Sequence, residues 1–172
     1  VTYDTDRSKI LFVGGYNYVS GMGNVYDGSV FEFDPVTAMY TKRDIPVGGD
    51  KPTARNNHAV SYDSGRRVVV LTAGYSQVTG GTTGPINDSW EWDSTAGKWS
   101  ETTPTTVKPL PRYQHLQVFD SVRATTLIFG GTVSADSTYG PQEIWQYIAS
   151  SAPRANGSGC SAATAASGDE LV

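Results

Sequence analysis

Residues 68–74, Val-Val-Val-Leu-Thr-Ala-Gly, indicate the fold class of this chain. A short, β-branched apolar run that ends at glycine is typical of a strand buried on both faces. A similar run precedes it at residues 10–15, Ile-Leu-Phe-Val-Gly-Gly, and another follows at residues 127–131, Leu-Ile-Phe-Gly-Gly. The copies are 59 and then 57 residues apart. Self-similarity at such a period predicts an architecture of stacked structural repeats.

Aromatic residues keep the same register after each apolar run. They come in pairs separated by one residue, which places both on one face of a strand; the pairs are Phe31 and Phe33, Trp90 and Trp92, and Trp145 and Tyr147. In the middle copy the pattern predicts strands over residues 57–62, 68–72 and 89–92, and a fourth strand from Trp99. Four antiparallel strands of this kind form a propeller blade, which buries both faces only by stacking on its neighbours.

The middle copy carries four landmarks in order: Arg55-x-x-His58, the apolar run into Gly74, Trp90-x-Trp92-Asp93, and Trp99. The third copy begins in the same way, with Arg112-x-x-His115. This pattern resembles the kelch repeat, and the resemblance covers roughly residues 1–150. It implies an all-β fold, a kelch-type β-propeller segment of about three four-stranded antiparallel blades.

The repeats predict a division of the chain into blades and a tail. Residues 1–46 form a partial blade, 54–103 a complete blade and 111–150 a partial blade without a fourth strand; residues 151–172 are a Ser/Ala/Gly-rich flexible tail or linker. The segment is therefore expected to be incomplete at both ends. Propellers close with four to eight blades, so we expect further blades from a longer chain or from a second copy of itself.

The connections differ in length between the two rims of the predicted propeller. The segments 16–27, 75–88 and 132–142 join the second and third strands of each blade and are much longer than a hairpin requires. Long loops on a rigid scaffold are a usual place for binding residues, and Tyr, Asn and Gln suit adaptable recognition. The predicted ligand-binding residues on this rim are Tyr16, Asn17, Tyr18, Tyr75, Gln77 and Tyr139.

The only two histidines, His58 and His115, occupy matching repeat positions, as do Arg55 and Arg112. We expect all four to be structural or to line the central channel, with the histidines bonded to backbone and the arginines paired with carboxylates across blades. The alternative is contact with an anionic ligand in the channel. Two isolated histidines do not make a metal site, which needs three or four converging ligands.

Composition narrows the classes of function. The formal net charge of -4 argues against nucleic-acid binding, and no apolar stretch is long enough for a membrane span. The single cysteine, Cys160, excludes an internal disulfide. Asn87 and Asn156 begin glycosylation-type sequons, weak support for an extracellular or cell-surface location.

The sequence predicts a non-catalytic module that binds a protein or a glycan and needs no cofactor. Copper-radical oxidases with kelch-like propellers use a Tyr–Cys pair, whereas Cys160 lies in the predicted tail, so we expect neither catalytic nor metal residues. Two alternatives stay open. The chain is a fragment of a carbohydrate-active kelch-propeller enzyme, of oxidase or isomerase type, or it is a structural spacer in a surface protein.

Overall fold

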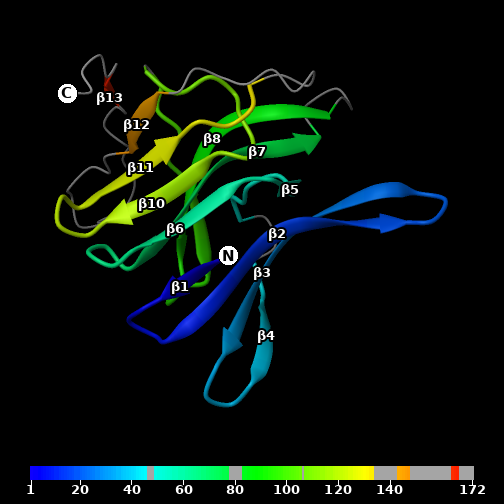
Figure 1. Ribbon diagram of the computed structural model, residues 1–172. Helices are drawn as coiled ribbons and strands as arrows, with labels where there is room; N and C mark the ends of the chain where they lie inside the picture. Colours follow the sequence, from blue (N-terminus) through cyan, green and yellow to red (C-terminus); the bar gives the residue numbers. More distant parts are fainter. Residues whose placement is uncertain (46–48, 78–82, 106, 134–142, 148–163, 167–172) are drawn as a thin grey trace.

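The computed structural model describes residues 1–45, 49–77, 83–105, 107–133, 143–147 and 164–166. For Asn24, Gln77 and residues 164–166 it describes the backbone alone. The described residues are all-β, with antiparallel pairing throughout and no helix among them. The predicted fold class is thus confirmed: the chain forms a partial, propeller-like array of sheets (Figure 1).

Three sheets follow one another along the chain. Sheet 1 has the order β1 (Thr2–Asp4), β2 (Lys9–Val19), β3 (Gly23–Asp34) and β4 (Met39–Arg43). Sheet 2 consists of β6 (Ala59–Asp63), β7 (Val68–Gln77), β8 (Thr83–Asp93) and β9 (Lys98–Glu101), and the short β5 (Arg55–Asn56) also pairs with β7. Sheet 3 has the order β10 (Leu116–Asp120), β11 (Thr125–Phe129), β12 (Ile144–Tyr147) and β13 (Thr164–Ala166).

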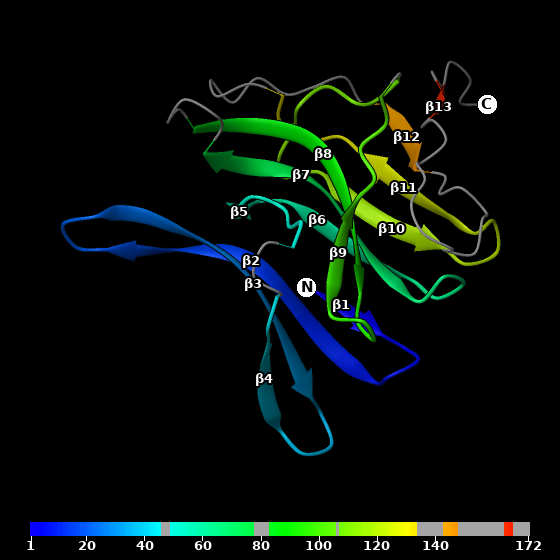
Figure 2. The same cartoon turned by 180° about the vertical axis from the view of Figure 1, so that it is seen from behind.

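The first strands of the sheets lie nearest to one another. Strand β6 contacts both β1 and β10, whereas the outer strands β4, β9 and β13 lie further apart (Figures 1 and 2). The sheets therefore stack in chain order, with sheet 2 between sheets 1 and 3. This is the relation expected of successive propeller blades.

Strand β7 shows why its sequence is apolar at consecutive positions. Val69 and Leu71 pack in one cluster with residues of sheet 1, while Val68 and Val70 pack in a second cluster with residues of sheet 3. Successive side chains of a strand point to opposite faces. Both faces of β7 are therefore interior, as the run at residues 68–72 predicted.

The two faces of each sheet differ in chemistry. We call the face that carries the paired aromatic residues the front face and the opposite one the back face. In sheet 2 the front face presents Trp90, Trp92 and Trp99 to the back face of sheet 1, which supplies Leu11, Val13 and Val30. In sheet 3, Trp145 and Tyr147 pack likewise on Val68 and Val70. Each contact is thus front to back, aromatic on aliphatic.

Ion pairs close the turn between the first two strands of each sheet. Asp63 accepts hydrogen bonds from the Gly65 and Arg66 backbone N–H groups, at 3.0 Å each, and its other oxygen pairs with the Arg66 side chain at 2.7 Å. Arg66 also pairs with Glu91. Asp4, Arg7 and Glu32 repeat this arrangement in sheet 1. Glu32 and Glu91 are both buried, and these arginines neutralise their charge.

The long segments predicted as loops are largely β-ribbons, which corrects the sequence analysis. Strands β2 and β3 stay paired from Gly15 with Asp27 out to Val19 with Gly23, and β7 and β8 stay paired out to Gln77 with Thr83. A bulge precedes each ribbon, at Gly14 and at Ala73. Segment 132–142 lies mostly outside the described residues. The β2–β3 ribbon projects far from the stacked sheets (Figures 1 and 2).

The fourth strand of sheet 3 comes from the predicted tail. The sequence indicated no such strand after Tyr147, yet the backbone of residues 164–166 pairs with Ile144, Trp145 and Gln146 of β12. No sequence signal indicates this strand, because Thr164-Ala165-Ala166 carries neither an aromatic nor an alternating apolar pattern. The domain boundaries themselves stay a prediction.

The front-to-back contact between sheets 1 and 2 gives a test of the stacking. Leu71 is fully buried there, so Leu71→Ala should lower the free energy of unfolding by about 2–5 kcal/mol. Urea denaturation followed by tryptophan fluorescence, at one fixed protein concentration, measures the change. Val36→Ala, at a position 87% exposed, is the control and should change stability by no more than about 0.5 kcal/mol. Equal effects of both variants would contradict this packing.

Candidate functional site

Arg55 and Arg112 are buried and satisfied within their own sheets. Arg55 donates to both carboxylate oxygens of Asp88, at 2.5 and 2.7 Å, and to the Ala73 carbonyl at 2.9 Å. Arg112 donates to Glu143 at 2.9 Å and to the Gly130 carbonyl at 2.8 Å. The expectation that these arginines pair across blades is wrong, because Asp88 lies in the third strand of the same sheet and Glu143 lies directly before it. Each guanidinium group therefore links a carbonyl at Ala73 or Gly130 to the acidic residue of the neighbouring third strand.

The two histidines connect neighbouring sheets. The Nε2 atom of His115 lies 2.9 Å from the Thr72 hydroxyl of sheet 2, and His58 hydrogen-bonds to the Val13 backbone of sheet 1. Burial and, after it, the nearby arginine (Arg55 or Arg112) together lower the pKa of each imidazole to about 4. Both histidines are therefore neutral at physiological pH.

Glycine is required where each histidine passes the bulge. A Cβ atom on Gly74 would lie 2.8 Å from the His58 Cβ, and one on Gly131 would lie 2.9 Å from the His115 Cβ. Both glycines also have positive φ, at 115° and 95°, which side-chain-bearing residues rarely adopt. Gly74 and Gly131, the second glycine position of the repeat, thus mark where a histidine passes close to the chain at or just after the second strand of its own sheet.

The β2–β3 ribbon carries an aromatic face. We call residues 15–19 and 23–27 the tyrosine ribbon. Tyr16 pairs in register with Tyr26, with ring centroids 6.4 Å apart. Tyr18 follows Tyr16 by two residues and shares its face. Tyr16 is 56% exposed and Tyr18 70% exposed, so the face is open to a ligand.

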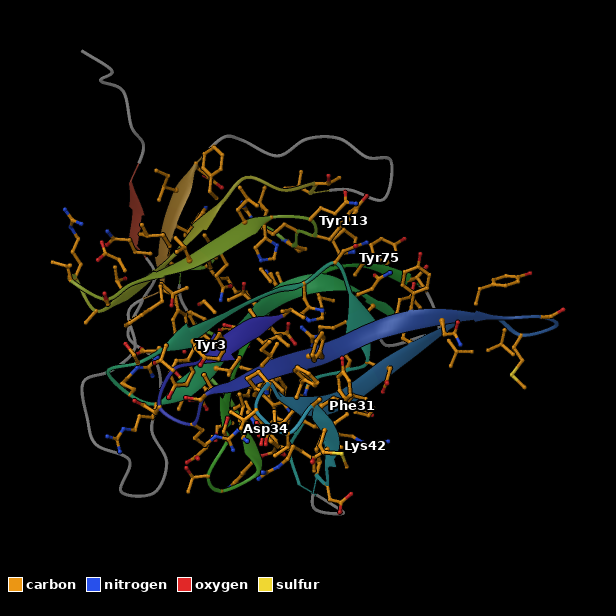
Figure 3. All side chains as sticks on the ribbon, turned by 60° about the horizontal axis from the view of Figure 1, so that its bottom comes forward. Tyr3, Phe31, Asp34, Lys42, Tyr75 and Tyr113 are labelled. Carbon is orange, nitrogen blue, oxygen red and sulfur yellow. The ribbon has the colours of Figure 1, made fainter. Side chains whose placement is uncertain are left out.

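A second pair of tyrosines lies on sheets 2 and 3. The rings of Tyr75 and Tyr113 are 5.1 Å apart in an edge-to-face arrangement, and Figure 3 shows them side by side. Burial raises the pKa of Tyr26, and its neighbours Tyr75 and Tyr16 raise it further. Strand β5, whose Asn56 pairs with Tyr75, also contacts β2 and β3. The Tyr75–Tyr113 pair therefore lies near the base of the tyrosine ribbon.

The structure brings only some of the predicted binding residues together. Tyr16, Tyr18 and Tyr75 lie on the same rim, whereas exposed Asn17 points to the opposite face of the ribbon from Tyr16. Gln77 lies at the end of β7, with its side chain outside the described part, and Tyr139 is outside the described residues. The predicted set lacked Tyr26 and Tyr113. The pairing of Tyr26 with Tyr16 can be inferred only when residues 15–27 are known to form a hairpin.

The described residues offer little space or ligand chemistry elsewhere. A cavity of about 30 Å³ lies between sheets 2 and 3, lined in part by Thr72, Asp88, Arg112 and Tyr147. That volume suits a water molecule and falls far below that of an organic-ligand pocket. In the described part of the chain, no group of three or more His, Cys, Asp or Glu residues is placed to hold a metal ion. Nor does any described segment form a helix long and apolar enough to cross a membrane.

Neither protein-family models nor curated proteins give a match to this chain.

The Arg55–Asp88 pair predicts that replacing either of two aspartates on this rim lowers the free energy of unfolding by different amounts. Asp88→Asn should lower the free energy of unfolding by about 3 kcal/mol, because Arg55 is left buried with less than a full counter-charge. Asp27→Asn is the matched control. The Asp27 carboxylate is exposed and accepts from the Ser29 backbone, so its loss should cost under about 1 kcal/mol. Chemical denaturation of both variants measures the difference, and equal costs would contradict a structural role for the pair.

The neutral histidines predict loss of stability in mild acid. Their folded pKa of about 4 lies below the ordinary value of 6.5, so between these values the unfolded chain binds more protons. The free energy of unfolding should therefore be highest above pH 6.5 and fall as the pH approaches 4. In the double variant His58→Gln/His115→Gln this fall should be smaller. Parallel pH profiles for the two proteins would show that the imidazoles do not titrate on unfolding.

Proposed function

We propose that this chain is a non-catalytic binding module of the kelch-propeller type, and that it recognises its ligand through the tyrosine ribbon and the adjoining Tyr75–Tyr113 pair. The observation that carries the proposal is the open aromatic face of the ribbon, at Tyr16 and Tyr18. Tyrosines combine a large apolar ring with a hydroxyl and lose little conformational entropy on binding, which suits recognition.

The ribbon is unusual for a strand pair left at a protein surface. Residues 16–26 contain no charged residue and no proline, although exposed strands are normally protected by such residues. Met22 at the tip is 78% exposed, and Val25 is 42% exposed on the face opposite the tyrosines. A long, uncharged and partly apolar ribbon favours a protein partner, which can cover both faces and pair with an open edge.

A glycan is the alternative ligand of the same surface, because tyrosine rings also stack on sugar rings. The two ligands differ in what they need. A glycan would use the tyrosine face alone, whereas a protein partner would also cover Val25 and Met22. Substitutions on the two faces therefore separate the alternatives.

The experiment begins with a photoreactive phenylalanine analogue placed at position 18 of the ribbon, or at position 36 as control. It identifies surface proteins that cross-link from position 18 but not from position 36. The affinity of the captured protein is then measured for the wild-type chain and for Tyr16→Ser/Tyr18→Ser. We expect the double variant to bind at least 30-fold more weakly, as for two central interface tyrosines. Val36→Ser, on the opposite rim, should bind within twofold of wild type.

A glycan array with the same variants completes the test. Binding to a glycan that is lost in Tyr16→Ser/Tyr18→Ser but kept in Val25→Ser would identify a carbohydrate ligand. Protein binding weakened by both substitutions would support the protein partner. Unchanged affinity of Tyr16→Ser/Tyr18→Ser for every ligand found would refute the site.

A further inference from the structure

Two sheet faces are left open by the described part of the chain. The front face of sheet 1 carries aromatic residues, among them Tyr3 and Tyr40, which are 47% and 63% exposed. The back face of sheet 3 carries apolar residues that are also exposed: Leu116 70%, Val118 58%, Phe129 41% and Ile144 46%. Single exposed apolar residues are ordinary, but contiguous apolar patches mark interaction surfaces.

The front face of sheet 1 forms one continuous aromatic layer. Tyr40 lies between Phe12 and Phe33, with ring centroids 5.9 and 4.6 Å away. Lys42 extends its ammonium group to 5.8 Å from the ring centroid of Phe31, and Figure 3 shows Lys42 beside Phe31. Phe31, Phe33 and Tyr40 occupy the same positions as the three tryptophans of sheet 2, which are buried against sheet 1.

We propose that these two faces bind each other between two copies of the chain, so that the copies form a closed head-to-tail dimer. The contact continues a series that is already established twice in the chain, where a front face packs on the preceding back face. The three sheets that the structure describes in each copy would together make six, within the range of four to eight that closes a propeller.

The sizes of the side chains support a match between these two faces. Inside the chain, large tryptophans on the front face meet small residues such as Val13 and Val30 on the back face. At the open faces the front-face residues are smaller than these tryptophans, and the back-face residues are larger than their counterparts inside the chain. Phe31, Phe33 and Tyr40 replace Trp90, Trp92 and Trp99. On the back face, Phe129 and Ile144 of sheet 3 stand where sheet 2 has Thr72 and Ser89. Such compensation keeps the total volume of a contact.

The polar partners change together as well. Between sheets 2 and 3 the Tyr147 hydroxyl donates to buried Glu91 at 2.7 Å. On the open faces the equivalent of Tyr147 is Phe33, which has no hydroxyl, and the equivalent of Glu91 is Gln146, which has no charge. A contact between Phe33 and Gln146 therefore buries no unpaired carboxylate, whereas a charged residue at position 146 would be costly there.

The first test is the solution mass of the full chain by light scattering on a sizing column. The proposal predicts a species near twice 18.4 kDa, and a monomer at micromolar concentrations would overturn it. Head-to-tail contacts that do not close give open fibres, so species that grow with concentration would also overturn the closed dimer.

Two charged substitutions then test the pairing of the faces. Tyr40→Asp alters the front face and Val118→Asp the back face, and each variant alone should be monomeric. Mixed at equal concentration they should form a heterodimer, because the unaltered back face of one copy meets the unaltered front face of the other. Met22→Asp, at the ribbon tip, is the control and should keep the mass of the wild type.

Both substituted positions are more than half exposed, so we expect each variant to fold. Circular dichroism and thermal melting of each variant test this. A dimer that is lost in Tyr40→Asp but kept in Val118→Asp would mean front-to-front association and refute the proposal. The readout is mass, so the result does not depend on any ligand of the tyrosine ribbon.

Discussion

The contact between the front face of one sheet and the back face of the preceding one is the constraint on which the structure depends. An apolar strand such as β7 has no solvent-facing side, since Val68 and Val70 point to one sheet and Val69 and Leu71 to the other. The middle sheet is therefore stable only between two neighbours. This need explains why the chain repeats one unit, and why aromatic residues recur on one face and aliphatic residues on the other.

Polar groups at the sheet boundaries are arranged to serve the same stacking. Arg7 pairs with Asp4 and Glu32 in sheet 1 and also donates to the Ser94 carbonyl of sheet 2 at 3.1 Å. His115 bonds across to Thr72. Each of these groups is partly or fully buried, so each needs a partner in the adjoining sheet. The polar contacts therefore fix the order and register of the sheets, and the apolar contacts supply most of the stabilisation.

The sequence predicted the repeat, the strand class and the buried second strands, because these depend on local periodicity and on apolar content. It did not predict that residues 15–27 form a ribbon. A stretch rich in Gly, Asn and Ser has the composition of a loop. Only the strand register that pairs Tyr16 with Tyr26 distinguishes a β-ribbon from a loop. It also placed the carboxylate partners of Arg55 and Arg112 in the wrong sheet. Pairing across space depends on how the bulge orients each arginine, which the spacing of residues does not reveal.

The tyrosine ribbon and the open sheet faces are physically independent, although the ribbon and one of these faces belong to sheet 1. The ribbon begins at the bulge around Gly14, where the register of β2 against β3 shifts, and a bulge increases the local twist and bends the strand away. Residues before the bulge are fixed by stacking, while residues after it are held by strand pairing alone. A ligand on the ribbon would therefore leave the sheet faces uncovered. Because the two surfaces do not overlap, the proposed ligand site and the proposed contact between copies could both be occupied in the same molecule.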